Sequence, residues 1–198
     1  ARIVSICGAI TEILYALGFE DRLAGVDSTS LYPPAALRDK PNVGYMRQLS
    51  AEGVLGLNPS LVLAAQGSGP KETMDVLEAA KVPLVLVPET FSEAGLIDKI
   101  KLVGHAMDAD KRAECLTEII SGDLAQLREL RSKVTKPVRV MFVMSLLNGR
   151  AMAAGQNTAA NEIIARAGAV NAIVGYDGYK IINDEAIVAA KPDVVLSI

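Results

Sequence analysis

Residues 49–63 read LSAEGVLGLNPSLVL, and residues 182–196 read INDEAIVAAKPDVVL. The glutamate, the proline and the apolar run that follows it recur at one constant offset, so the second stretch repeats the first. A second echo lies upstream of each copy, where TEILYALG at 11–18 parallels NEIIARAG at 161–168. Two copies are too few for a solenoid, which needs at least about three repeats to bury its faces. The repeat therefore predicts two similar lobes with a ligand cleft between them.

Short apolar runs alternate with helical patterns in the first half of the chain, and the strand pattern returns at 138–143. We expect Thr11 to cap the first helix and the proline-rich stretch 28–41 to form a polar loop. Strands that alternate with helices imply an α/β fold with mostly parallel sheets covered by helices. The expected strands are 2–7, 23–26, 61–64 and 84–87, and the expected helices are 12–17, 54–57 and 72–80.

The middle of the chain differs, because 92–133 contains no proline and places its apolar residues at helical spacing. This pattern predicts a helix ending near Met107, a break at 108–110, and a long helix to about Lys133. We expect this helical segment to join the lobes as a stiff rod, so that the lobes move little against each other. The predicted domains are an N-terminal lobe (1–91), a helical connection (92–136) and a C-terminal lobe (137–198).

Composition excludes several classes of protein. A net charge of −3 gives no electrostatic footprint for nucleic acid, and no apolar run approaches the roughly 20 residues of a membrane span. Cys7 and Cys115 match no metal or redox spacing, and we expect both to be buried thiols. The chain starts at Ala1 without Met and soon enters a strand, which is compatible with a removed signal peptide and export.

The usual catalytic patterns are missing. The sequence has no Walker loop, no GxGxxG after a strand, no HExxH and no nucleophile elbow. A Ser-His-Asp triad would depend on His105, which we expect to be a partly exposed structural residue of the connecting helix. We therefore predict that the protein is not an enzyme. An α/β enzyme acting on a small metabolite remains the alternative from a different class.

The loop PNVGYMRQL at 41–49 carries the most distinctive chemistry. It lies between a strand and the first repeated helix, at the edge where open α/β sheets bind ligands. Tyr45, Met46 and Arg47 bring together a phenol, a soft apolar side chain and a guanidinium. One interpretation is a tyrosine packed on its own lobe. The other is a phenolate ligand to iron, with Arg47 favouring the ionised phenol through charge and hydrogen bonding.

Four motifs carry a specific resemblance: VDSTSLYPP at 26–34, GYMRQLSAEG at 44–53, AGQNT at 154–158 and GYK at 178–180. With them, the chain resembles the periplasmic haem-binding proteins of bacterial ABC haem importers over residues 3–196. These belong to a wider group of substrate-binding proteins, with two lobes joined by a helix, that also bind cobalamin and siderophores. The GYxRQL motif is the part that indicates haem.

The resemblance implies roles for four residues. Tyr45 is similar to the axial ligand of the haem iron, and Arg47 to its partner or to a contact of a haem propionate. The repeated glutamates, Glu52 and Glu185, are similar to two surface carboxylates that dock on arginines of the membrane permease. Their alternative interpretation is that each is a first-turn helix acid complementing the helix dipole.

The second lobe should supply the other wall of the cleft, from the loop 145–150, the turn 155–157 or the segment 176–180. Arg150 and Lys180 are candidates to pair with a propionate, or they are simply solvated. The expected cleft lining is Met46, Gln156, Asn157 and Tyr179.

The resemblance thus implies a periplasmic haem carrier that serves iron acquisition, with haem as the transported ligand and permease subunits as partners. The alternative is a cobalamin or ferric-siderophore carrier, in which Tyr45 and Arg47 line the cleft without a metal bond. Members of the group continue beyond position 198 with a further strand and helices. The second lobe is therefore expected to be truncated.

Overall fold

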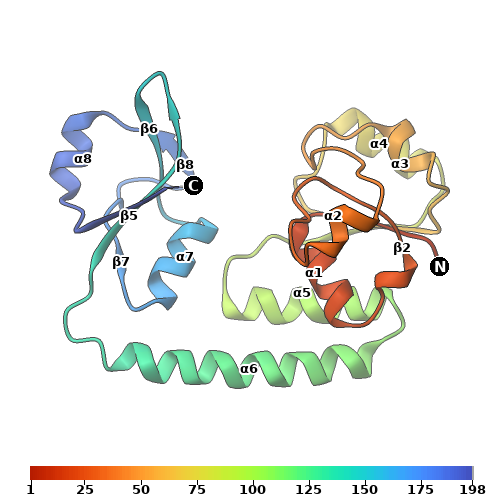
Figure 1. Ribbon diagram of the computed structural model, residues 1–198, viewed down its shortest axis with the longest axis horizontal. Helices are drawn as coiled ribbons and strands as arrows, with labels where there is room; N and C mark the ends of the chain where they lie inside the picture. The colour runs from red at the N-terminus through yellow and green to blue at the C-terminus, as the bar shows by residue number, and fades with distance from the viewer. Residues whose placement is uncertain (198) are drawn as a thin grey trace. The chain divides into compact units, whose positions relative to one another are not determined.

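The computed structural model describes residues 1–197, which form two compact units (Figure 1). Unit 1 comprises residues 1–90 and 94–120, and unit 2 comprises residues 91–93 and the chain from 121 onward. Each unit contains one β-sheet, which confirms the predicted α/β architecture. The finer division into 1–91, 92–136 and 137–198 stays a prediction.

The sheet of unit 1, sheet A, has four strands in the order β2-β1-β3-β4, and all neighbours are parallel. All four strands had been predicted from short apolar runs bounded by turns. Such runs are typical of parallel strands because both faces of the sheet are covered by helices. The strands are β1 (Ile3–Ile6), β2 (Leu23–Val26), β3 (Leu61–Ala65) and β4 (Leu84–Val87).

Two hydrophobic cores cover the two faces of sheet A. Successive strand residues point to opposite faces. Ile3 therefore enters the core that contains α1 and α5 (Glu93–Ala106), and Val4 enters the core that contains α3 and α4. The helical elements before the middle of the chain are α1 (Gly8–Ala16), the 3-10 turn η1 (Glu20–Arg22), α2 (Ala35–Asp39), α3 (Ala51–Leu55) and α4 (Lys71–Ala79).

The start of α1 corrects one prediction. The helix begins at Gly8, so Thr11 lies inside it and is not its N-cap. The Thr11 hydroxyl is fully buried and shares hydrogen bonds with the hydroxyls of Ser5 (2.7 Å) and Ser30 (2.8 Å). A second correction concerns the predicted polar loop at 28–41, which contains the short helix α2.

The predicted helical middle is confirmed as two helices. Helix α5 spans Glu93–Ala106 and helix α6 spans Asp110–Ser132, with the break at 107–109. The boundary between the units falls inside α6, after Ile120. That α6 acts as a stiff rod stays a prediction.

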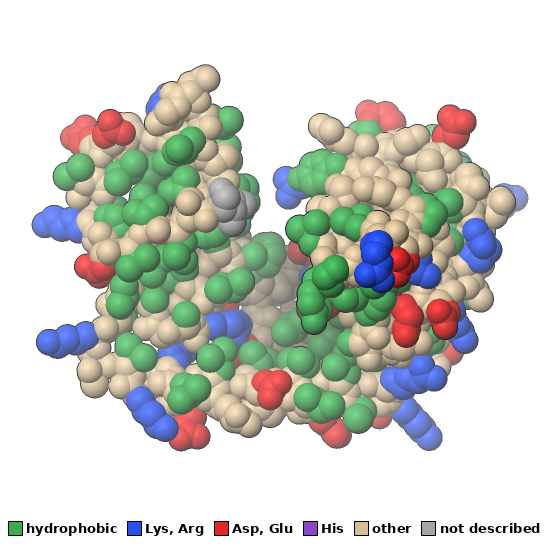
Figure 2. Space-filling view, viewed as in Figure 1, with side chains coloured by type: hydrophobic (Ala, Val, Ile, Leu, Met, Phe, Trp, Pro, Cys, Tyr) green, Lys and Arg blue, Asp and Glu red, His purple; other side chains and the backbone are tan. Residues whose placement is uncertain are grey.

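Sheet B of unit 2 is mixed. Strand β5 pairs in parallel with β7 and β9 and antiparallel with β6, and β8 pairs antiparallel with β6. Figure 2 shows many hydrophobic side chains at the surface of this unit. Strand β9 is exposed along its whole length. The elements are β5 (Arg139–Leu147), β6 (Arg150–Ala154), α7 (Ala159–Arg166), β7 (Val170–Asn171), β8 (Tyr179–Ile181), α8 (Asp184–Ala190) and β9 (Val194–Ser197).

The predicted loop at 145–150 was wrong, because these residues form the tip of the β5–β6 hairpin. Asn148 and Gly149 make the turn with φ angles of 51° and 77°. A two-residue turn with positive φ at both positions strongly favours Asn-Gly, since its twist matches that of the flanking strands. The turn places Arg150 directly opposite Leu147.

Candidate functional site

The loop that carries Tyr45 crosses the carboxyl edge of sheet A. The backbone N–H of Ser28, just after β2, donates to the carbonyl of Gly44 over 2.9 Å. The N–H of Gly69, after β3, donates to the carbonyl of Met46, also over 2.9 Å. Because β1 lies between β2 and β3, the loop passes over the end of the central strands. Tyr45 therefore lies where open α/β sheets place their ligands.

The loop is anchored by its apolar residues and leaves its polar ones accessible. Leu49 is buried, and Met46 is half-buried against both cores of unit 1. Tyr45 is 42% exposed, and Arg47 is exposed as well. Gly44, with φ at +96°, supplies a backbone conformation that a side chain would disfavour. The phenol is thus held on a fixed loop within reach of a ligand.

A buried polar knot fixes the neighbouring loop after β2. The fully buried carboxylate of Asp27 accepts hydrogen bonds from the backbone N–H groups of Cys7 (2.9 Å) and Thr29 (3.1 Å). It also accepts from the hydroxyls of Thr29 (2.8 Å) and Ser30 (3.1 Å). Sequence reasoning missed this knot, although an Asp followed by Ser and Thr residues is a local signal for such a turn. We call Asp27, Thr29 and Ser30 the Asp27 knot.

The other strand ends at this edge carry an ion pair and a thiol. Lys99 of α5 pairs with Glu89, after β4, at 2.6 Å, with 9% and 29% of their side chains exposed. Burial raises the pKa of the Cys7 thiol, which argues against a reactive thiolate. Cys115 is exposed, so the expectation that both thiols are buried was wrong.

The candidate residues of unit 2 separate into two groups. Gln156 bonds to the backbone of Tyr176, Tyr179 pairs with Ala154, and the Lys180 ammonium lies 5.0 Å from the centre of the Tyr176 ring. These residues, with the exposed Asn157, gather at the end of β6.

Arg150 lies at the start of the same strand. Lys180 is paired with Ala153, three residues along β6 from Arg150, which at about 3.3 Å per residue is about 10 Å. An odd spacing along a strand also places the two side chains on opposite faces of the sheet. Arg150 and Lys180 therefore do not form one basic cluster.

Tyr176 is the structural tyrosine of this group. Its hydroxyl donates to the carbonyl of Ala153 over 3.0 Å, and burial raises its pKa. A Cβ at Gly155 would lie 2.6 Å from the Tyr176 ring, so the glycine makes room for this packing. Tyr179 is half-buried within β8.

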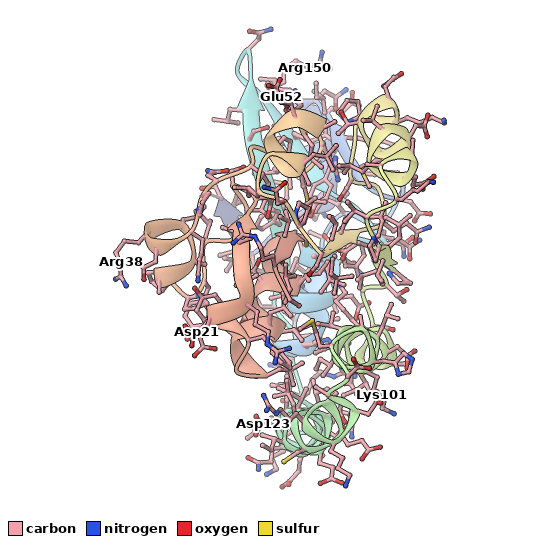
Figure 3. All side chains as sticks on the ribbon, turned by 90° about the vertical axis from the view of Figure 1, so that its right-hand side faces the viewer. Asp21, Arg38, Glu52, Lys101, Asp123 and Arg150 are labelled. Atoms are coloured by element: carbon pink, nitrogen blue, oxygen red, sulfur yellow. The ribbon has the colours of Figure 1, made fainter. Side chains whose placement is uncertain are left out.

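Glu52 and Glu185 occupy matching positions. Each is the second residue of a short helix that precedes a strand, α3 before β3 and α8 before β9. Ser50 and Asn183 cap these helices by accepting a hydrogen bond from the N–H three residues later, at 3.3 and 2.8 Å. Both glutamates are exposed, and Figure 3 shows Glu52 on α3. A carboxylate in a helix's first turn also complements its dipole.

The repeat extends to contacts that sequence reasoning missed. The Arg2 guanidinium donates to the carbonyl of Leu57 at the end of α3 over 2.8 Å. The Arg139 guanidinium donates to the carbonyl of Ala190 at the end of α8, also over 2.8 Å. We call these contacts the arginine clasps.

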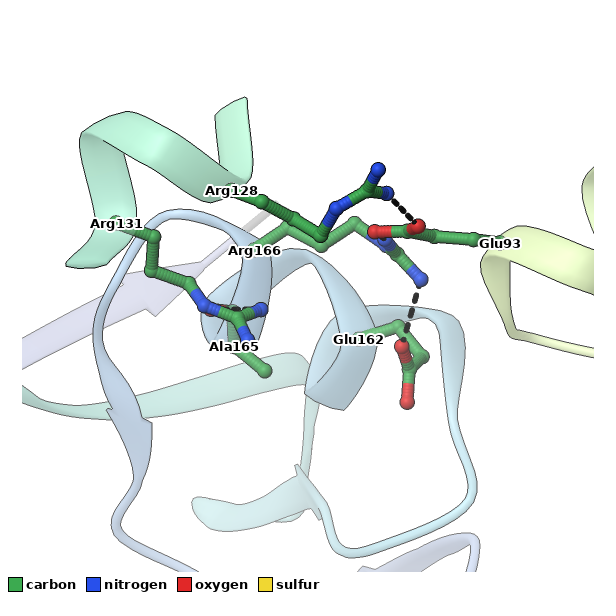
Figure 4. A network of polar contacts seen from close by, with 6 residues as sticks. All are labelled: Glu93, Arg128, Arg131, Glu162, Ala165 and Arg166. Atoms are coloured by element: carbon green, nitrogen blue, oxygen red, sulfur yellow. Dashed lines mark hydrogen bonds and ion pairs between the residues drawn. The ribbon is translucent and has the colours of Figure 1, made fainter. Parts of the chain in front are cut away.

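A network of charged side chains lies within unit 2 (Figure 4). Glu93, the first residue of α5, accepts from Arg128 of α6 and from Arg166 of α7, the latter over 2.6 Å. Arg166 also donates to Glu162 over 3.1 Å. Burial raises the pKa of Glu93, but hydrogen bonds and charge from Arg166 and Arg128 outweigh it and hold the pKa below its usual value.

Residues 1–197 contain neither a candidate membrane span nor a cluster of metal-ligating side chains. No helix in this range is long and apolar enough to cross a membrane. No group of three or more His, Cys, Asp or Glu side chains there could hold a metal ion. His105 is exposed on α5 beside Asp110, with 3.1 Å between Nδ1 and the carboxylate.

Comparison with known proteins identifies the family. Residues 3–197 match the family model described as periplasmic binding protein. The chain belongs to the periplasmic binding protein family. Membership confirms the resemblance drawn from the motifs and the prediction of a binding protein over an enzyme.

Two solved structures of this family are similar throughout the chain. The periplasmic heme-binding protein RhuT from Roseiflexus sp. RS-1, in apo form, is 40% identical, with a TM-score of 0.94 over 99% of this chain and 75% of that one. The periplasmic heme-binding protein BhuT, in complex with two hemes, is 38% identical, with a TM-score of 0.93 over 99% and 76%.

Two curated relatives extend the comparison. An uncharacterized ABC transporter substrate-binding lipoprotein, YvrC of Bacillus subtilis, is 29% identical over 99% of this chain. A vitamin B12-binding protein of Yersinia pestis is 33% identical over 57% of it. The chain spans 63% of the length of the first and 36% of the second.

Proposed function

We propose that this chain captures haem at the carboxyl edge of sheet A, with Tyr45 bonded to the iron, as the periplasmic substrate-binding protein of an ABC importer. The observation that carries the proposal is the exposed Tyr45 on an anchored loop over the strand ends. Similarity to the heme-binding proteins RhuT and BhuT supports haem as the cargo.

The chemistry of the loop suits a ferric porphyrin. Tyrosine is one of the side chains that hold haem iron, and its phenolate oxygen is a hard donor. Arg47 lies two residues further along the same exposed loop, where its charge would favour an anionic phenolate or pair with a propionate. Met46 belongs to the same loop and is part of the proposed lining of the site.

The proposal also includes contacts between haem and residues of unit 2. Lys180 is an exposed cation stacked on Tyr176, and Arg150 is an exposed cation at the hairpin tip. Because about 10 Å of strand separates Arg150 from the residue paired with Lys180, we assign them to different contacts instead of one shared propionate. Gln156, Asn157 and Tyr179 are the proposed lining beside Lys180.

Delivery to the permease is assigned to Glu52 and Glu185. Both are exposed and sit at the same position of equivalent helices. Such rim charges mainly set the rate and orientation of encounter with a partner of opposite charge.

The first test replaces Tyr45 with Phe, which removes the oxygen and keeps the ring. We expect Tyr45→Phe to lower the affinity for ferric haem and to abolish the charge-transfer bands of tyrosinate-bound iron in the visible spectrum. Tyr15→Phe is the matched control, because Tyr15 is a partly exposed tyrosine of α1 outside the proposed site. If Tyr45→Phe retained the wild-type spectrum and affinity, the iron bond to Tyr45 would be wrong.

A second candidate function is supported by the vitamin B12-binding relative. In a cobalamin carrier, Tyr45 and Arg47 would line the site without a bond to the metal. Titration with cyanocobalamin separates the two candidates. Tight binding of cyanocobalamin with no spectral change on addition of haemin would favour the cobalamin carrier.

A further inference from the structure

Two large apolar side chains stand in solvent beside the Tyr45 loop. Leu31 is 71% exposed and Tyr32 is 64% exposed, although both belong to a well-packed unit. They follow directly on Ser30, which is fully buried. Isolated apolar side chains at a surface are normal. Two adjacent ones in a loop next to a ligand-binding loop indicate a surface that contacts a ligand or another molecule.

The backbone that carries this pair is fixed on both sides. Upstream, the Asp27 knot holds Thr29 and Ser30, and the N–H of Leu31 donates to the carbonyl of Thr29 over 2.8 Å. Downstream, the N–H of Ala36 donates to the carbonyl of Pro33 over 2.9 Å as α2 begins. A rigid loop loses little conformational entropy on binding, so contacts made by its side chains are not offset by the cost of ordering it.

The loop that carries the pair neighbours the loop of the proposed iron ligand. The hydrogen bond from Ser28 to Gly44 joins the loop after β2 to the Tyr45 loop at the same edge of sheet A. Each of these neighbouring loops carries an exposed tyrosine, Tyr32 in one and Tyr45 in the other.

We propose that Leu31 and Tyr32 form an apolar shelf that contacts the tetrapyrrole ring itself and selects for large, flat, apolar ligands. The proposal rests on the proposed haem-binding function and adds to it a contact that is independent of iron. An aromatic ring next to a leucine offers a large apolar area at low entropic cost. The shelf would favour a porphyrin over a polar ferric chelate, which presents little apolar surface.

The test compares ferric haemin with protoporphyrin IX, which has the same ring system and no metal. Affinities of both ligands are measured by fluorescence quenching or absorption for the wild type, Leu31→Ser/Tyr32→Ser, Tyr32→Phe and Tyr45→Phe. Val76→Ala is the matched control, since Val76 is an exposed apolar residue on α4. Far-UV circular dichroism checks that each variant is folded, which the exposure of the substituted residues favours.

The expected affinities distinguish a contact of Leu31 and Tyr32 with the tetrapyrrole ring from a bond between Tyr45 and the iron. The double serine variant should bind both compounds about tenfold more weakly, equivalent to partial loss of two buried apolar contacts. Val76→Ala should bind both like the wild type. Tyr32→Phe, which keeps the ring, should affect the two compounds equally, and Tyr45→Phe should lose affinity only for ferric haemin.

Two results would overturn the shelf while the haem function stands: unchanged affinities in the double variant, or loss of only haemin binding in Tyr32→Phe, which would make Tyr32 an iron ligand. If the wild type bound neither compound, the haem function would fail and the shelf with it.

Discussion

Arg139 makes in unit 2 the contact that Arg2 makes in unit 1: each guanidinium bonds, over 2.8 Å, to a carbonyl at the end of the helix that carries a repeated glutamate. Their backbone N–H groups match as well, since Arg2 donates to the Ser60 hydroxyl and Arg139 to the Asp193 carboxylate, both over 2.8 Å. The repeat therefore includes the attachment of the helix, and it extends beyond the sequence of the helix and its strand.

Breaking an arginine clasp should destabilise the unit that contains it. Arg139→Met keeps the apolar stem and removes the guanidinium, so the carbonyls of Ala190 and Lys191 lose their donor. We expect the free energy of unfolding to fall by about 1 kcal/mol, as for a partly exposed hydrogen bond. Urea denaturation followed by circular dichroism measures the loss. Lys136→Met, at a nearby exposed cation, should change little.

Replacing both repeated glutamates should reduce the delivery of haem to the permease and leave haem binding unchanged. We expect Glu52→Ala/Glu185→Ala to bind haem like the wild type but to reduce uptake in cells, with the double variant worse than either single one. Because salt screens exposed charges, the defect in permease binding should shrink as ionic strength rises. Wild-type transport by the double variant at low ionic strength would return both residues to a role as helix-terminal charges.

The charged network around Glu93 predicts a dependence of stability on pH. The folded pKa of Glu93 is lowered, so its contribution is fully present above the unfolded value of about 4.3 and is lost as pH falls through the folded value. Glu93→Gln should be less stable than the wild type at neutral pH, and the difference should vanish in acid. Glu129→Gln, at an exposed pair with Lys133, serves as the control. A difference in the free energy of unfolding between the wild type and Glu93→Gln that did not change with pH would contradict a stabilising role for the ionised Glu93.

Cys7 holds a backbone conformation that suits glycine, with φ at 125° and ψ at 129°. Such conformations cost residues with a Cβ about 1–3 kcal/mol. Both Cys7→Gly and Cys7→Ala remove the thiol, but only the glycine variant removes the Cβ. We therefore expect Cys7→Gly to unfold at a higher urea concentration than Cys7→Ala. The reverse order would show that the Asp27 bond to the Cys7 N–H leaves no strain to relieve.

Local patterns were enough to predict the strands of sheet A, because they are short apolar runs bounded by turns. The position of the Tyr45 loop followed from its place in the sequence between a strand and the first repeated helix. The hairpin at Asn148 and Gly149 was also encoded locally but was missed. Contacts such as Glu93 with Arg166 could not be predicted, since periodicity reports on neighbours along the chain only. The same limit applies to Arg150 and Lys180, which β-sheet register separates.

The Asp27 knot also bears on how binding preference can diverge. It holds the loop after β2 with short polar side chains and backbone groups, so none of the support comes from the side chains of residues 31 and 32. These two positions can therefore be exchanged for almost any side chain without disturbing the core beneath them. A small combinatorial library at 31 and 32 would explore new cargoes on an unchanged scaffold, and natural descendants of this chain have the same freedom.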